Sequence, residues 1–193
     1  NIQREEVKVQ RALVFIQSGK SKEAEDIYRE LIKKGSSNYV VYANLAILCL
    51  NKGEIDEMFK FFKRALEIEP NIPEAHNSLG IAFKRQGDLN SAVSSYKQAL
   101  KLKPNYPAAH VNLGVTFQEK GEIKTAISTF KKALKLKPDY PAAHTNLGRA
   151  YLLNLDYQRG WLENEYRFKN FINSVIPHAN PPIPKWQGEG INS

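Results

Sequence analysis

The feature that most constrains the fold is an internal repeat of 34 residues. Pro70, Pro104 and Pro138 lie 34 positions apart and close the similar phrases RALEIEP, QALKLKP and KALKLKP. Residues 71–104 and 105–138 are identical at about half of their positions. Chance does not produce such agreement, so we expect similar structural units that stack on one another along the chain.

Each unit has the pattern of two amphipathic helices. Apolar residues from Ile123 to Leu134 follow the i, i+3, i+4, i+7 spacing of a helix, and a second apolar series around Leu113 precedes them. Gly121 lies between the two series, where a glycine can adopt the positive φ that ends a helix. The sequence therefore predicts an all-α solenoid in which no unit buries its apolar face alone.

The units resemble the tetratricopeptide repeat, a pattern of 34 residues with a bulky residue at position 4, Leu-Gly at positions 7 and 8, and aromatic residues, alanines and a proline further on. The unit that ends at Pro138 carries this pattern at His110, Leu113, Gly114, Phe117, Ala126, Phe130, Ala133 and Pro138. The resemblance implies a right-handed superhelix of about five helix pairs over residues 1–172, with repeats at 5–38, 39–72, 73–106, 107–140 and 141–172. It also implies that the first helices line a concave groove that binds a peptide or protein.

The last unit departs from the pattern. Leu155 replaces the glycine between the helices and Gly160 replaces an alanine, while a helical apolar spacing continues to Ile172. We expect a modified capping helix, followed by a Pro- and Gly-rich tail or linker at residues 173–193. This segment is similar to the junction at which bacterial tetratricopeptide proteins continue into a glycosyltransferase-like domain, with matches at Asp156, Tyr157, Gly160, Trp161, Glu165, Tyr166, Arg167, Phe168, Pro184, Trp186 and Gly188.

Several functional classes find no support in the sequence. The longest apolar run, residues 45–50, is far shorter than the roughly 18 residues that a membrane span needs. The single cysteine, Cys49, excludes an intrachain disulfide and a multi-cysteine zinc site. Without an acid–base pair, a phosphate-binding loop or a metal-ligand cluster, we expect no catalytic activity and no cofactor in this segment. We expect a cytoplasmic location.

His76, His110 and His144 occupy the same place in successive units, which raises the question of a metal site. Equivalent positions in stacked helix pairs lie about 10 Å apart, whereas zinc ligands converge to about 2 Å from the ion. We therefore interpret these histidines as packing residues at a position that is usually aromatic.

Polar residues recur two places further on, at Asn44, Ser78, Asn112 and Asn146. AHVNLG and AHTNLG are similar to the repeats of O-linked N-acetylglucosamine transferase, in which an asparagine ladder holds a peptide backbone. A carboxamide offers both a donor and an acceptor, so it can bind a peptide unit without reading side chains. The alternative is that these residues only join one repeat to the next by hydrogen bonds.

The candidate groove has a mixed lining that suits a moderately polar peptide. It comprises Asn44, Asn77, Ser78, Ile81, Lys84, Arg85, Val111, Asn112, Val115, Gln118, Glu119, Thr145, Asn146 and Arg149. The predicted function is peptide or protein binding, with a substrate-recruiting arm of a glycosyltransferase-like protein as its specific form. A self-assembling scaffold, in which a groove or an end stacks on another copy, is the alternative.

The formal net charge is +8. Most of it lies between Lys97 and Lys137, a segment that contains nine lysines and only two acidic residues. The family places second helices on the convex side, which suggests a solvated lysine face. Binding of nucleic acid or another anionic surface is the other possibility, although no aromatic residues are interleaved to stack on bases.

Overall fold

The structure, a computed structural model, describes residues 2–175. Over these residues it contains ten α-helices and no strand, which confirms the predicted all-α class. The helices are α1 (Ile2–Gln17), α2 (Ser21–Lys33), α3 (Tyr39–Lys52), α4 (Ile55–Ile68), α5 (Pro73–Arg85), α6 (Leu89–Leu102), α7 (Pro107–Glu119), α8 (Ile123–Leu136), α9 (Pro141–Leu153) and α10 (Tyr157–Val175). The predicted tail lies outside the described residues from position 176 onward.

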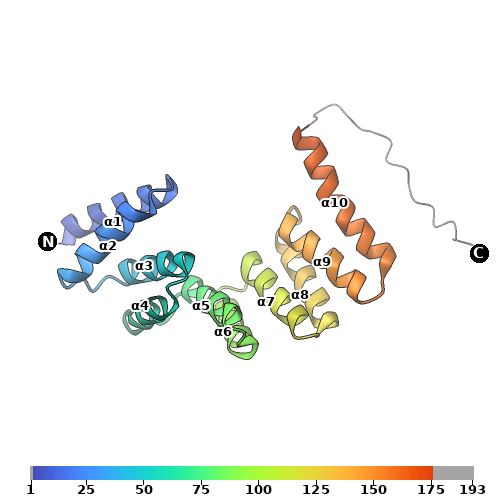
Figure 1. The fold of residues 1–193 in the computed structure, drawn as a ribbon, viewed down its shortest axis with the longest axis horizontal. Helices are drawn as coiled ribbons and strands as arrows, with labels where there is room; N and C mark the ends of the chain where they lie inside the picture. Colours follow the sequence, from blue (N-terminus) through green and yellow to red (C-terminus); the bar gives the residue numbers. More distant parts are fainter. Residues whose placement is uncertain (1, 176–193) are drawn as a thin grey trace, which may run out of the picture.

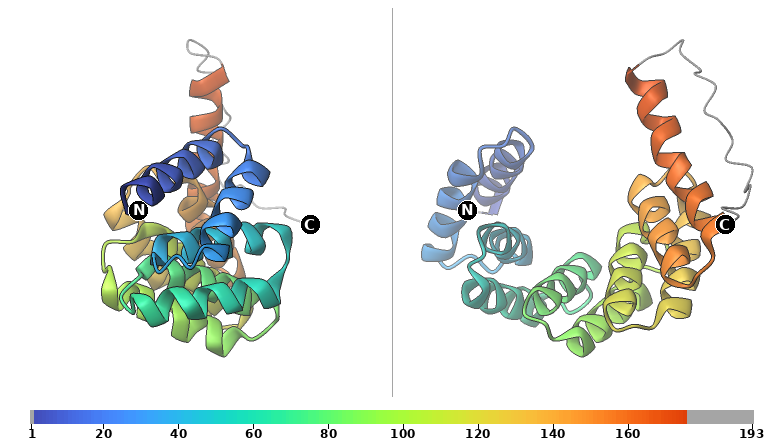
Figure 2. Two further views of the ribbon diagram at one scale, coloured as in Figure 1. Left: turned by 90° about the vertical axis from the view of Figure 1, so that its left-hand side faces the viewer. Right: turned by 45° about the vertical axis from the view of Figure 1, so that its right-hand side comes forward.

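Consecutive helices form pairs, and the pairs stack into an open arc with α1 and α10 at its two ends (Figures 1 and 2). The second helix of one pair packs on the first helix of the next, as in α6 with α7 and α8 with α9. The first helices α3, α5, α7 and α9 also contact one another in turn. They approach more closely because they line the inside of the curve, which leaves the second helices on the outer side.

Helix boundaries follow the repeat. Pro73, Pro107 and Pro141 stand in the first turns of α5, α7 and α9, where a missing backbone N–H is not needed. The turns inside the pairs use glycine, as at Gly121 with φ 80°. In the last pair this place is taken by Leu155, which also adopts a positive φ, of 61°.

The core has an aromatic side chain at the same place in four second helices. Tyr28, Phe62, Tyr96 and Phe130 lie 34 residues apart and are fully buried. In two of these pairs, Gly80 and Gly114 of the first helix lie directly against the ring, so the two helices approach closely there. No helix in the described part of the chain is long and apolar enough to cross a bilayer.

Candidate functional site

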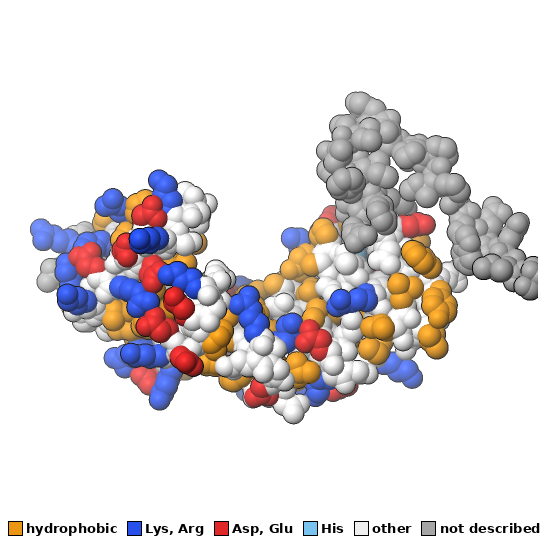
Figure 3. All heavy atoms as spheres, in the orientation of Figure 1, with side chains coloured by type: hydrophobic (Ala, Val, Ile, Leu, Met, Phe, Trp, Pro, Cys, Tyr) orange, Lys and Arg blue, Asp and Glu red, His pale blue; other side chains and the backbone are white. Residues whose placement is uncertain are grey.

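The predicted groove residues lie on α3, α5, α7 and α9, the helices on the inside of the arc. The space-filling view shows this side hollowed between the two ends of the molecule (Figure 3). Acidic and basic side chains are interspersed over the N-terminal helices, while apolar side chains gather where α9 turns into α10 (Figure 3).

Three of the predicted groove residues are buried, namely Asn77, Ser78 and Val111. Asn77 is 7% exposed, and its Oδ1 accepts a hydrogen bond of 3.1 Å from Asn112 Nδ2. This bond joins α5 to α7. Side chains buried in this way offer little surface to a ligand, whereas their half-buried neighbours Ile81 and Val115 contribute apolar surface beside them. Which residues contact a ligand stays a prediction.

The asparagines differ in what they bond to. Asn44 Nδ2 donates to Tyr28 Oη at 3.2 Å, which links α3 to α2, and Asn112 links α7 to α5. Asn146 Nδ2 instead donates to the Ala142 carbonyl of its own helix at 2.7 Å. The first two bonds support the interpretation that these side chains join repeats, while Asn146 remains the strongest candidate for ligand binding.

The aromatic residue of the preceding second helix helps to explain this difference. Asn44 faces Tyr28, whose hydroxyl can accept a hydrogen bond, whereas the residue equivalent to Tyr28 in the pair before Asn146 is Phe130. Neither Phe130 nor Val111, which stands where Asn112 finds Asn77, has a side-chain oxygen to accept from Asn146. The asparagine therefore turns to its own helix, and its Oδ1 accepts from Arg149 Nη2 at 3.2 Å.

Charged side chains link the first helices along the inner side. Lys84 Nζ of α5 lies 3.0 Å from Glu119 Oε1 of α7. With the Gln118 amide oriented so that its oxygen accepts, Arg149 Nε of α9 donates to it at 2.8 Å. Arg85 Nη1 donates to the Leu50 carbonyl near the end of α3 at 2.8 Å. A polar ligand can exchange for these exposed or half-exposed contacts without leaving buried groups unpaired.

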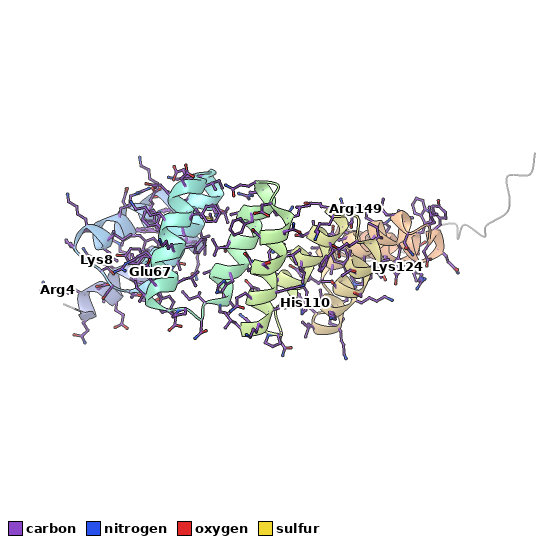
Figure 4. All side chains as sticks on the ribbon, turned by 90° about the horizontal axis from the view of Figure 1, so that it is seen from below. Arg4, Lys8, Glu67, His110, Lys124 and Arg149 are labelled. Atoms are coloured by element: carbon purple, nitrogen blue, oxygen red, sulfur yellow. The ribbon has the colours of Figure 1, made fainter. Side chains whose placement is uncertain are left out.

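The outer side carries the lysines that the sequence placed on second helices. Lys97 and Lys101 of α6, and Lys131, Lys132 and Lys135 of α8, lie on these helices, and all five are exposed. Figure 4 views the arc from this outer side, with Lys124 of α8 and Glu67 of α4 labelled. An anionic partner for this face stays a prediction.

His144 makes contacts that the sequence did not reveal. Its Nδ1 lies 2.6 Å from Glu163 Oε2, its Nε2 lies 2.8 Å from the Pro138 carbonyl, and its ring stacks on Tyr166 with centroids 3.7 Å apart. The contacts with Glu163 and Tyr166 hold α10 against α9, and the bond to Pro138 joins α9 to the turn before it. The available signal was Glu163 itself, which stands where the preceding unit has the buried Thr129.

One group of possible metal ligands occurs among the described residues, and it does not fit an ion. Cys49, Glu54 and Glu57 bring their ligand atoms within 4.8 Å of one another. Arg29 Nη2 already binds Glu57 at 2.6 Å, and burial raises the pKa of the Cys49 thiol to about 12. A protonated thiol and a paired carboxylate are poor ligands.

Family models of the tetratricopeptide repeat match residues 39–72, 61–94, 82–121 and 116–154. No curated protein sequence matches the chain.

Three solved structures illustrate the fold. Pseudomonas aeruginosa pilF is 18% identical, with 86% of this chain and 76% of that chain covered and a TM-score of 0.78. MamA from Desulfovibrio magneticus RS-1 is 16% identical, with 89% and 97% covered and a TM-score of 0.76. A thermophilic TPR protein of Thermus thermophilus is 20% identical, with 86% and 90% covered and a TM-score of 0.70.

Proposed function

Because the chain belongs to the tetratricopeptide repeat family, we propose that it binds an extended segment of a peptide or protein on the inner side of its arc. The observation that carries the proposal is the continuous inner surface of α3, α5, α7 and α9, which these helices form by contacting one another in turn. Repeat proteins use such concave surfaces for extended ligands. The ligand we expect is moderately polar, because Ile81 and Val115 alternate with charged and amide side chains.

Asn146 and Arg149 are the residues we propose to contact the ligand backbone at the C-terminal end of the groove. One hydrogen bond leaves the Asn146 carboxamide with a further N–H donor, and the exposed guanidinium of Arg149 has several. Asn112 would have to bind a ligand while keeping its bond to Asn77. We therefore place it second to Asn146 in the proposed ladder.

The specific form of the proposal is that this solenoid recruits substrates for a glycosyltransferase-like domain. It is supported by the resemblance of the junction from Asp156 onward, of which Arg167, Phe168, Pro184, Trp186 and Gly188 lie outside the described side chains. The complete reading frame tests this form. If the frame encodes no sugar-nucleotide-binding α/β domain beyond Ser193, the glycosyltransferase form of the proposal is wrong. The proposal of peptide binding in the groove would still hold.

Self-association is the second candidate function. Val7 and Val14 of α1 are exposed, whereas the equivalent Val41 and Leu48 of α3 are buried under the preceding pair. Another copy could cover these valines. Sedimentation that shows a monomer across micromolar concentrations would count against this candidate.

Groove binding can be tested with a synthetic peptide array screened against the purified chain. The strongest binder is then titrated by calorimetry against the wild type, Asn146→Ala and Arg149→Ala. We expect both substitutions to weaken the affinity, and we expect Lys132→Ala on the outer side to leave it unchanged. Binding that depends on Lys132 and ignores Arg149 would contradict the proposal.

A further inference from the structure

Exposed apolar side chains gather on the last helix and the turn that leads into it. Tyr157 is 57%, Trp161 59% and Leu162 63% exposed on α10, and Leu155 in the turn is 73% exposed. We call these four residues the α10 face. Figure 3 shows apolar side chains at this end of the arc. Tyr157 and Trp161 lie one turn apart on the same face of α10, and exposed apolar side chains gathered in this way mark an interaction site.

Two residues of the α10 face stand at positions that are buried or half-buried in the three preceding pairs. Trp161 is equivalent to Phe59, Val93 and Ile127 of α4, α6 and α8. The Phe59 ring packs on Phe83 of the following first helix, with centroids 5.0 Å apart, and Val93 is buried. Tyr157 is likewise equivalent to Ile123, which packs against the core. In the earlier pairs, side chains at these two positions therefore pack against neighbouring helices.

The other two residues have no apolar counterpart in the repeats. Leu162 is equivalent to the polar Ser128 and Ser94, and Leu155 replaces a glycine. Another repeat stacked on α10 would cover Tyr157 and Trp161 and leave Leu162 in water. The α10 face is therefore wider than a contact between repeats, which favours an occupant of another kind.

Residues 176–193 follow directly from the end of α10 and have a composition that fits this face. Pro181, Pro182 and Pro184 favour the polyproline II conformation, which aromatic surfaces such as Tyr157 and Trp161 bind. At about 3.1 Å per residue the segment spans about 55 Å, whereas α10 is about 28 Å long. It can therefore return along the whole helix, and its tether gives it a high effective concentration there.

We propose that residues 176–193 dock on the α10 face, with Ile183 and Trp186 supplying apolar contacts beside the prolines. The segment would then complete the solenoid as an extended cap and shield Trp161 from water. The proposal is independent of the function of the groove, because α10 lies at the end of the arc.

The two tryptophans of the chain, Trp161 and Trp186, allow a direct test in the whole protein. Trp186→Phe leaves Trp161 as the reporter, and its emission maximum and acrylamide quenching are measured. We expect blue-shifted emission and quenching several-fold weaker than in the same chain with Ile183→Asp added. In the reciprocal chain with Trp161→Phe, we expect Leu162→Asp to shift Trp186 emission to the red. Circular dichroism checks that each variant keeps its helices.

Two outcomes of these fluorescence measurements would overturn the proposal. Quenching of Trp161 that Ile183→Asp leaves unchanged means that the tail does not cover the α10 face. A blue shift that grows with protein concentration means that a second copy covers it instead. Lys132→Asp is the matched control for added charge, and we expect it to alter neither reporter.

Discussion

The Phe130 ring lies directly against the backbone of Gly114. A Cβ atom on Gly114 would stand 2.5 Å from Phe130 Cε1, a distance that packed atoms do not adopt. Tyr96 and Gly80 repeat the relationship one unit earlier, where the distance would be 2.6 Å. Both rings are fully buried, so the glycine sets how closely the two helices of a pair approach.

Gly114→Ala is therefore expected to destabilise the protein. Alanine favours a helix interior by about 1 kcal/mol relative to glycine, but overpacking a core costs about 1 to 3 kcal/mol. We expect the free energy of unfolding in urea to fall by about 1 kcal/mol. In a Phe130→Leu background the same substitution should cost less, because the smaller side chain makes room. A stabilised Gly114→Ala protein would contradict the packing described.

The sequence predicted the parts of the fold that repeat, and it missed what depends on a partner across an interface. The small residue at Gly114 and the aromatic residue at Phe130 follow from the 34-residue frame. Whether an asparagine joins repeats depends on the residues opposite. Asn44 bonds to Tyr28 and Asn112 to Asn77, whereas Asn146 has Phe130 and Val111 at those two places. His144 bonds to α10, where the pattern has already departed from the family, so its contacts required the structure.

Asn112→Ala and Asn146→Ala should differ in their effect on stability. Loss of Asn112 removes the donor to Asn77 Oδ1, and Asn77 is buried, so the free energy of unfolding should fall by about 1 to 2 kcal/mol. Asn146 bonds within α9 at a half-exposed site, so its loss should cost no more than about 0.5 kcal/mol. Urea unfolding of both variants measures this. Equal small losses would show that the Asn112–Asn77 bond does not stabilise the stack.

Stability should fall as the pH drops below about 6.5 because of His76 and His110. Burial lowers the pKa of both imidazoles below the ordinary value of 6.5, so below that pH the unfolded chain binds more protons than the folded chain. Their contribution is present above pH 6.5 and is lost as the pH falls through the folded-state values. His110→Phe, which suits an aromatic position, should flatten the melting temperature over this range. The carboxyl pKa of Glu25 is lowered mainly by its hydrogen bond with Lys52. This group changes the stability only below about pH 4.5.

Leu155→Gly is expected to stabilise the protein. Leu155 adopts φ 61°, a left-handed conformation that costs an L-residue about 1 to 2 kcal/mol and that glycine adopts freely. The side chain is exposed, so its removal loses little buried surface, and the other three residues of the α10 face remain for residues 176–193 to contact. We expect the free energy of unfolding to rise by about 1 kcal/mol, and Gly121→Leu at the equivalent position to lower it by a similar amount. A loss of stability in Leu155→Gly would mean that the side chain makes a stabilising contact, which the tryptophan reporters of the α10 face can then locate.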